Sequence, residues 1–136
     1  MTDIESALTQ RGFSSYADRL EAVRTLAGDT SPRSTAALVG LLGDDDAAVV
    51  GEAAGALLQR GEPGWREVVT ASWRSEDTGI SEAIRSAAVD RIIAGDPVEA
   101  LLSAIADGEP ASDTGKGAAD LLMGLGMRPV AYLDED

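Results

Sequence analysis

The sequence predicts an all-α fold, an α-solenoid of about four stacked helical hairpins, and two observations lead to it. The first is helical periodicity: Ile84, Ala88 and Ile92 recur at i, i+4 and i+8, as in a helix that buries one stripe. The second is repetition at a nearly constant period, which is the signature of repeat architectures. The repeated positions are separated by 32, 34 and 31 residues, and each is followed three residues later by alanine: Arg19, Gly51, Arg85 and Lys116.

The first expected unit covers residues 1–29. A short first helix is closed by Gly12, because glycine is the usual stop at a helix C-terminus. A second helix, capped by Ser14 or Ser15, is expected to run to Ala27. The unit is therefore one helical hairpin.

The second expected unit covers residues 30–62. Ser31 is expected to cap its first helix, with Pro32 at the first helical position, where a missing backbone N–H costs nothing. A turn at 43–46 then leads to a second, strongly apolar helix over 47–60.

Two glycines interrupt the second helix of this unit, Gly51 and Gly55. Each costs about 1 kcal/mol relative to alanine in a helix interior. We therefore expect a neighbouring helix to approach the backbone closely at these positions.

The third expected unit covers residues 63–96 and begins at Pro63. A loop over 75–79 separates its helices. Ser81 is expected to cap the second helix, which ends at Gly95.

The fourth expected unit covers residues 97–129, so that residues 1–129 form one repeat domain. Asp96, which precedes a proline, is expected to cap its first helix. A polar loop over 107–115 leads to a second helix over 116–125, and residues 130–136 form an acidic C-terminal tail.

The composition of the chain provides few of the residue types that commonly carry out catalysis. The chain of 136 residues contains no cysteine and no histidine, which removes disulfides, thiolate chemistry, the imidazole base and most zinc, copper and haem sites. We therefore expect no enzyme activity, no cofactor and no metal.

Charge favours some partners over others. With 24 acidic and 11 basic residues the formal net charge is −13, which repels nucleic acid and anionic membranes and attracts basic partners. The chain has no apolar run long enough to cross a membrane and no signal peptide, so a cytoplasmic location is expected. Richness in alanine, glycine and arginine with a single lysine, Lys116, is typical of a GC-rich bacterial genome.

Two acidic motifs have a catalytic or metal-binding interpretation. The Asp-Thr-Gly triplets at 77–79 and 113–115 resemble those of aspartic proteases, but both are expected inside helical hairpins, where turn and N-cap chemistry explains them. The aspartates at 44–46 lack the alternating ligand spacing and distal glutamate of a calcium loop. A solvated turn is the favoured interpretation.

The second helices carry a recurrent pattern, apolar-Arg-x-x-Ala-x-x-x-Leu before a glycine, best matched at 84–88. This pattern resembles the short bacterial HEAT-like repeat over nearly the whole chain. It departs at Gly51 and Lys116, which replace the arginine, and at Asp18, where an apolar residue is usual. The resemblance implies a curved stack with first helices on one side and second helices lining the other, a shape that grips partners.

The function expected from this pattern is a non-catalytic protein–protein interaction module, an adaptor or scaffold. Its partner is expected to be another protein, and the acidic surface is compatible with a basic one. That partner would be held through acidic residues of the second helices, although ordinary solvated faces explain the same charges. The acidic candidates are Asp18, Glu21, Glu52, Glu82 and Asp90.

Two tryptophans are further candidates. Trp65 and Trp73 share a helical face with Val69, so they either pack in the core, which is favoured, or form a ridge that binds a partner. The pattern does not indicate an oligomeric state.

Two other functions remain as alternatives. A compact acidic protein suits an immunity or inhibitor protein that neutralises a basic toxin such as a nuclease. The resemblance also extends to HEAT-like lyase components, which would need a pigment-sized apolar cleft.

Overall fold

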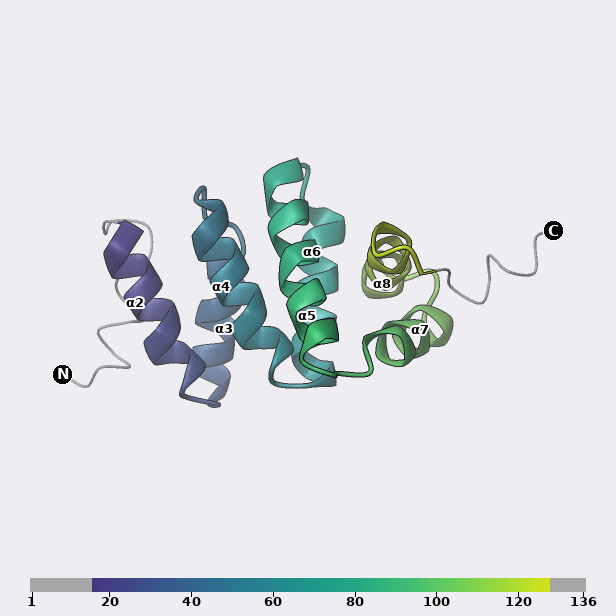
Figure 1. The fold of residues 1–136 in the computed structure, drawn as a ribbon, viewed down its shortest axis with the longest axis horizontal. Helices are drawn as coiled ribbons and strands as arrows, with labels where there is room; N and C mark the ends of the chain where they lie inside the picture. Colours follow the sequence, from purple (N-terminus) through teal and green to yellow (C-terminus); the bar gives the residue numbers. More distant parts are fainter. Residues whose placement is uncertain (1–15, 128–136) are drawn as a thin grey trace.

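The computed structural model describes residues 16–127, which fold into α-helices joined by short loops, with no strand in that range (Figure 1). The all-α prediction is confirmed for this part of the chain. The expected first helix before Gly12, its partner's cap at Ser14 or Ser15 and the tail at 130–136 lie outside the described residues. The helices are α2 (Tyr16–Ala27), α3 (Pro32–Leu41), α4 (Ala47–Leu58), α5 (Glu62–Arg74), α6 (Thr78–Ile93), α7 (Val98–Gly108) and α8 (Asp113–Gly124).

The second helices of the first three repeats form one layer. Helix α4 packs between α2 and α6, while α3 and α5 lie in a second layer behind them (Figure 1). Because no single hairpin can bury its own apolar stripe, each hairpin buries that stripe against the next hairpin. This is the arrangement that the repeat pattern predicts.

The fourth repeat departs from that arrangement. Helix α8 packs mainly against α5 and α7 instead of extending the layer of second helices beyond α6. Figure 1 shows α7 and α8 nearly end-on, whereas α2, α4 and α6 run across the view. The expectation that every second helix lines the same side is therefore wrong for α8. One consequence is that α6 leaves Ile93 79% exposed.

The positions that are buried also shift, by one residue, in the fourth repeat. The repeat spacing predicts that Ala119, three residues after Lys116, and Met123, four residues further on, are buried, but Met123 is 53% exposed. The buried residues are Ala118 and Leu122, one position earlier. Because α8 packs against α5, its buried face is rotated relative to those of α4 and α6.

The core is built from small and aliphatic side chains, as the low aromatic content predicts. Ala22, Ala54 and Ala88 occupy the repeated alanine position, and all are buried. Trp65 is the one aromatic residue in the core of the described chain. Close helix contacts follow from alanine at these positions, since a small side chain lets two backbones approach.

Some of the expected helix starts are confirmed. Ser31 caps α3, with its hydroxyl accepting a hydrogen bond from the Ser34 amide, and Pro32 occupies the first helical position. Asp46 caps α4 by accepting from the Ala48 amide at 2.9 Å. These contacts satisfy amides that have no partner within their own helix.

Other expected starts are wrong, since α6 and α8 begin earlier in the chain than expected and α7 lacks the expected side-chain cap. Asp77 caps α6, so Ser81 lies inside the helix and caps nothing. Ser112 caps α8 by accepting from the Gly115 amide at 3.0 Å, which reduces the expected loop over 107–115 to a few residues. Asp96 makes no side-chain cap for α7 and instead binds Arg91.

Arg60 joins the end of the second repeat to the end of helix α2. Arg60, just beyond α4, donates through Nη2 to the carbonyl oxygens of Leu26, at 2.9 Å, and Asp29. Its Nη1 donates to the Thr35 hydroxyl, and the buried Ser34 hydroxyl donates to the same Leu26 carbonyl at 2.7 Å. A cation thus satisfies carbonyl oxygens at the C-terminal end of α2, where the helix dipole also favours positive charge.

Polar contacts fix α8 and the loop that precedes it on α5. Arg66 donates to both carboxylate oxygens of Glu109 at 2.8 Å, and Arg74 donates to Asp113 at 2.8 Å. The hydrogen bonds from Arg66 hold the pKa of Glu109 below its usual value, against the opposing effect of desolvation, and Ser112 adds to the lowering. The ionised form of Glu109 is therefore the one that the fold stabilises.

The lowered pKa makes a testable contribution to acid stability. A carboxyl with a lowered folded-state pKa stabilises the fold above its unfolded-state pKa, and the contribution disappears as pH falls through the folded-state pKa. Glu109→Gln is therefore expected to lower the free energy of unfolding at pH 7. The difference from the wild type should shrink as pH falls below about 4. Urea unfolding at a series of pH values measures this difference.

The control for this experiment is Glu67→Gln, since Glu67 is exposed on the same helix as Arg66. Its difference from the wild type should vary much less with pH than that of Glu109→Gln. A Glu109→Gln difference that stays constant from pH 7 to about pH 3 would show that the Arg66 contact contributes nothing to folding.

Candidate functional site

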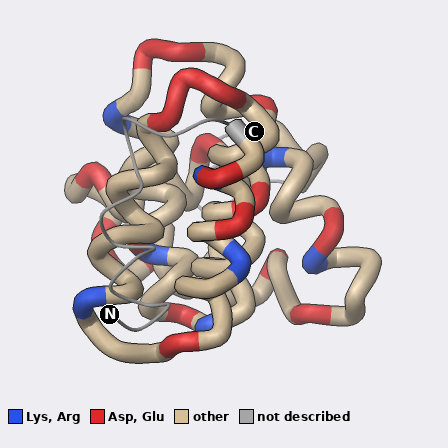
Figure 2. The backbone as a smooth tube through the Cα atoms, turned by 90° about the vertical axis from the view of Figure 1, so that its left-hand side faces the viewer, with Lys and Arg blue, Asp and Glu red and all other residues tan. Residues whose placement is uncertain are grey.

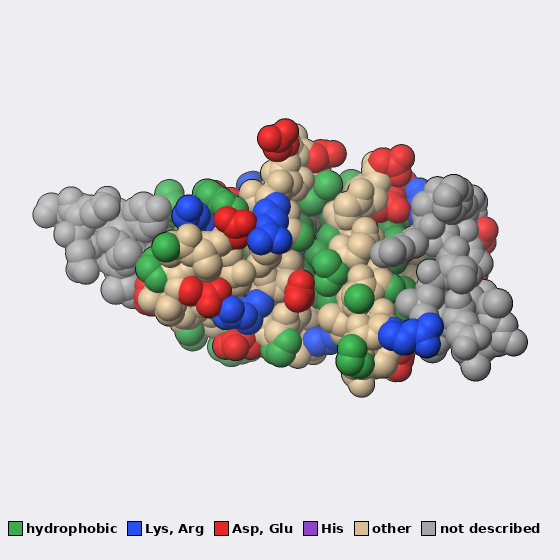
Figure 3. Space-filling model, turned by 180° about the vertical axis from the view of Figure 1, so that it is seen from behind, with side chains coloured by type: hydrophobic (Ala, Val, Ile, Leu, Met, Phe, Trp, Pro, Cys, Tyr) green, Lys and Arg blue, Asp and Glu red, His purple; other side chains and the backbone are tan. Residues whose placement is uncertain are grey.

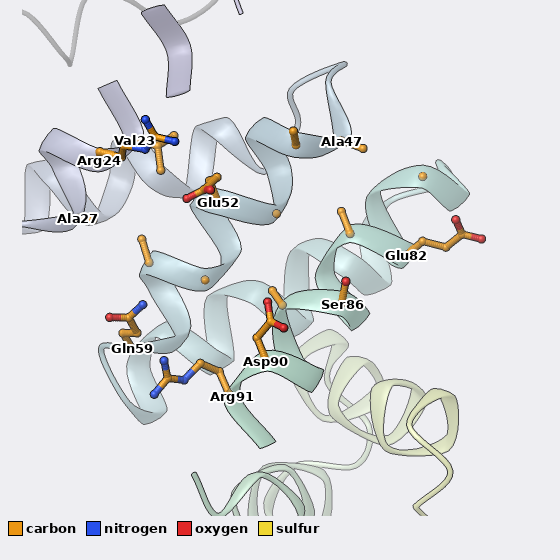
Figure 4. Close-up of a pocket in the computed structure, with 17 residues that line it drawn as sticks. Val23, Arg24, Ala27, Ala47, Glu52, Gln59, Glu82, Ser86, Asp90 and Arg91 are labelled. Carbon is orange, nitrogen blue, oxygen red and sulfur yellow. The ribbon is translucent and has the colours of Figure 1, made fainter. Parts of the chain in front are cut away.

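The layer of second helices encloses a groove of about 710 Å³, lined by α2, α4 and α6 (Figure 4). We call it the second-helix groove. Its lining on α4 and α6 consists largely of glycine and alanine, including Gly51, Gly55, Ala83 and Ala87. Small side chains on two neighbouring helices leave an open trough between the longer residues at its margins.

The expectation of a close helix approach at Gly51 and Gly55 is wrong. A Cβ atom placed at either position would meet nothing within 4 Å. The close approaches lie elsewhere, for example at Gly117, where a Cβ would lie 2.1 Å from the Val69 carbonyl oxygen. The two α4 glycines therefore widen the groove and do not serve the packing of helices.

Three of the acidic candidates gather around the second-helix groove. Glu52 comes from α4, whereas Glu82 and Asp90 come from successive parts of α6, and all three are exposed (Figure 4). Asp90 extends over the trough beside Ser86, while Glu82 projects at one end of the groove (Figure 4). The repeat thus places carboxylates from two second helices around one open space.

Two arginines also line the groove, but one of them is engaged by a carboxylate. Arg91 donates from Nε and Nη2 to the two oxygens of Asp96, at 2.8 and 3.2 Å. This hydrogen bonding raises the pKa of Arg91 and lowers that of Asp96, while desolvation opposes both shifts. With Arg91 paired, Arg24 on α2 is the remaining cation along the groove. The groove therefore carries an excess of negative charge.

The other candidates lie apart from this groove. Asp18 and Glu21 are exposed on α2 but are not among the residues that line it. Trp65 is only 1% exposed, so the idea that it forms a binding ridge is wrong and the core interpretation holds. Trp73 is 43% exposed on α5, next to α8, and belongs to the other layer.

The sequence contains a signal for the groove in the spacing of two glycines. Gly51 and Gly55 are spaced four residues apart, which places them on one face of α4 beside Glu52. The pairing of Arg91 with Asp96 was not predicted, because it joins the end of a helix to the following turn.

The aspartates at 44–46 have structural partners. Asp44 lies 2.9 Å from Nε of Arg19 and accepts a hydrogen bond from the Asp46 amide, while Asp46 caps α4. Within residues 16–127, no group of three or more acidic side chains is arranged to hold a metal ion. The turn therefore links α2 to α4.

Charged residues are spread widely over the described part of the chain. Viewed along the stack from the α2 end, Figure 2 shows acidic positions distributed over much of the backbone. The face opposite to that of Figure 1 carries acidic and basic side chains interspersed with apolar ones (Figure 3).

Across residues 16–127, no helix combines the length and apolar character needed to cross a membrane.

A family model of HEAT repeats matches residues 6–89, more than half of the chain. This match includes α2 to α5 and most of α6, and so covers most of the three helices that line the groove. No curated protein and no solved structure matches the chain.

Proposed function

Since the chain belongs to the HEAT-repeat family, whose repeats are generally protein-interaction modules, we propose that it is a non-catalytic module that binds another protein in the second-helix groove. The observation that carries the proposal is the groove itself, an open space of about 710 Å³ formed by three successive second helices. A concave, largely preformed surface suits recognition because little of it must be ordered on binding.

The carboxylates of the groove indicate the charge of the partner's surface. Glu52, Glu82 and Asp90 supply negative charge at its margin, so the partner presents a basic surface to it. Such complementarity acts mainly on the rate of association and on the orientation of the partner. It also makes the interaction weaker at high salt, because exposed charges are screened.

Charge reversal in the groove tests this proposal. The tagged protein, incubated with a lysate of its own cells, is expected to retain a partner that the variant Glu52→Lys with Glu82→Lys does not retain. Both side chains are exposed, so the fold should tolerate the change, and circular dichroism checks that it does. Mass spectrometry then compares the bound proteins at low and high salt.

The matched control reverses two exposed glutamates outside the groove, Glu67 on α5 and Glu99 on α7. It changes the net charge by the same amount and should retain the partner. Equal retention by the wild type and both variants would place binding elsewhere and contradict the proposal. A single basic partner bound at one-to-one would favour the inhibitor form of this function over the adaptor form.

A further inference from the structure

Resting on that proposed function, we propose that the groove receives a long cationic side chain of the partner, an arginine or a lysine. Its aliphatic stem lies on the floor formed by Gly51 and Gly55, and its charged end lies among the groove carboxylates. The partner is thus a basic segment of another protein, recognised side chain by side chain. Arginine and lysine suit such a site because they bury their stems while the charged head remains near polar groups.

The first support is that the fold itself does not need these glycines. Both lie inside α4, where glycine is a poor helix former, and both have negative φ. A Cβ atom at either position would meet nothing within 4 Å, so alanine fits the isolated protein without any shift. What alanine would change is the depth of the groove, since both residues line it.

The second support is charge complementarity. Three exposed carboxylates line the groove, and of its two cations Arg91 is already bound to Asp96 at 2.8 Å. The remaining negative charge favours a cation as occupant and disfavours an acidic segment. Ala83 and Ala87 of α6 provide an apolar wall beside the same floor, which suits the methylene groups of a cationic side chain.

The test uses a defined probe, an alanine-rich helical peptide with arginine at every fourth position, and its glutamate counterpart. Titration of the ¹⁵N-labelled protein is followed by NMR. The arginine peptide is expected to shift the amide signals of Gly51, Gly55 and Ser86, and the glutamate peptide is not. Absence of shifts with the arginine peptide, or shifts spread evenly over all acidic surfaces, would overturn the inference.

The decisive variant is Gly51→Ala with Gly55→Ala. It is expected to melt at a higher temperature than the wild type and yet to bind the arginine peptide roughly tenfold more weakly, because the added methyl groups occupy the floor. Gly108→Ala is the matched control, since a Cβ at Gly108 also meets open space but lies on α7, outside the groove. This control should bind as the wild type does.

A charge-neutral variant separates this inference from the proposed function. Glu52→Gln with Glu82→Gln and Asp90→Asn removes the groove carboxylates, and its control removes Glu67, Glu99 and Asp107, which are also exposed. Suppose that removal of the groove carboxylates weakens peptide binding, whereas the control set and Gly51→Ala with Gly55→Ala do not. The proposed role of the two glycines is then wrong, and the acidic groove remains the binding surface. If neither groove variant weakens peptide binding, the groove is not the binding surface and both proposals fail.

Discussion

Ala88→Asp is expected to unfold the protein. Ala88 is fully buried in α6 at the repeated alanine position, where α6 packs against its neighbours. An aspartate there would place an unpaired carboxylate in the core, at a cost of about 4 kcal/mol or more. That is a large part of the roughly 5–15 kcal/mol by which typical domains are stable. Thermal unfolding followed by circular dichroism measures the effect.

Ser86→Asp provides the control for this substitution. Ser86 lies two residues earlier in the same helix and is exposed, so the carboxylate that the substitution introduces remains in water. This variant should melt within a few degrees of the wild type. A melting curve for Ala88→Asp that resembles that of Ser86→Asp would contradict the assigned register of α6.

Gly117→Ala is expected to have the second largest effect. A Cβ atom on Gly117 would lie 2.1 Å from the carbonyl oxygen of Val69 and 3.2 Å from the Cβ of Trp73. Helices α5 and α8 must therefore separate to admit the methyl group. We expect a net loss of about 2 kcal/mol, after the gain of about 1 kcal/mol from better helix propensity. Urea unfolding gives the value directly.

The groove glycines are the comparison for this prediction. Gly51→Ala and Gly55→Ala make the same chemical change inside a helix, but nothing lies within 4 Å of the added atom. Each is expected to raise the free energy of unfolding by up to about 1 kcal/mol. A stabilised Gly117→Ala variant would show that α8 does not pack on α5 at this distance.

Local signals predicted most of the helices of the first three repeats. The serine–proline pair at Ser31 gave the start of α3, and the repeated alanines identified residues that are buried in α2, α4 and α6. These features depend on only a few neighbouring residues. They can therefore be read without knowing how the helices pack.

The fourth repeat could not be predicted in the same way. The register of α8 depends on its packing against α5, a helix about 50 residues earlier in the chain, and this rotation exposes Met123. Similarly, a glycine in a helix pattern indicates either a close approach, as at Gly117, or an open floor, as at Gly51. Only the positions of the neighbouring helices distinguish these two cases.

The candidate site was predicted in part. Helical spacing indicated that Glu52, Glu82 and Asp90 belong to second helices, and the structure brings these three to one groove. Trp65 could not be separated from Trp73 by spacing alone, because both lie on the same face of α5. Their different burial depends on how neighbouring helices cover each end of α5, because Trp73 remains 43% exposed even though it lies next to α8.

The central claim is that the acidic groove recognises the partner. Its most direct test is the association rate constant of the purified, captured partner, measured from low salt to about 0.5 M salt. We expect the association rate constant at low salt to be at least about tenfold lower for Glu52→Lys with Glu82→Lys than for Glu67→Lys with Glu99→Lys. The difference should diminish as salt rises. Equal rates for the two variants at low salt would contradict it.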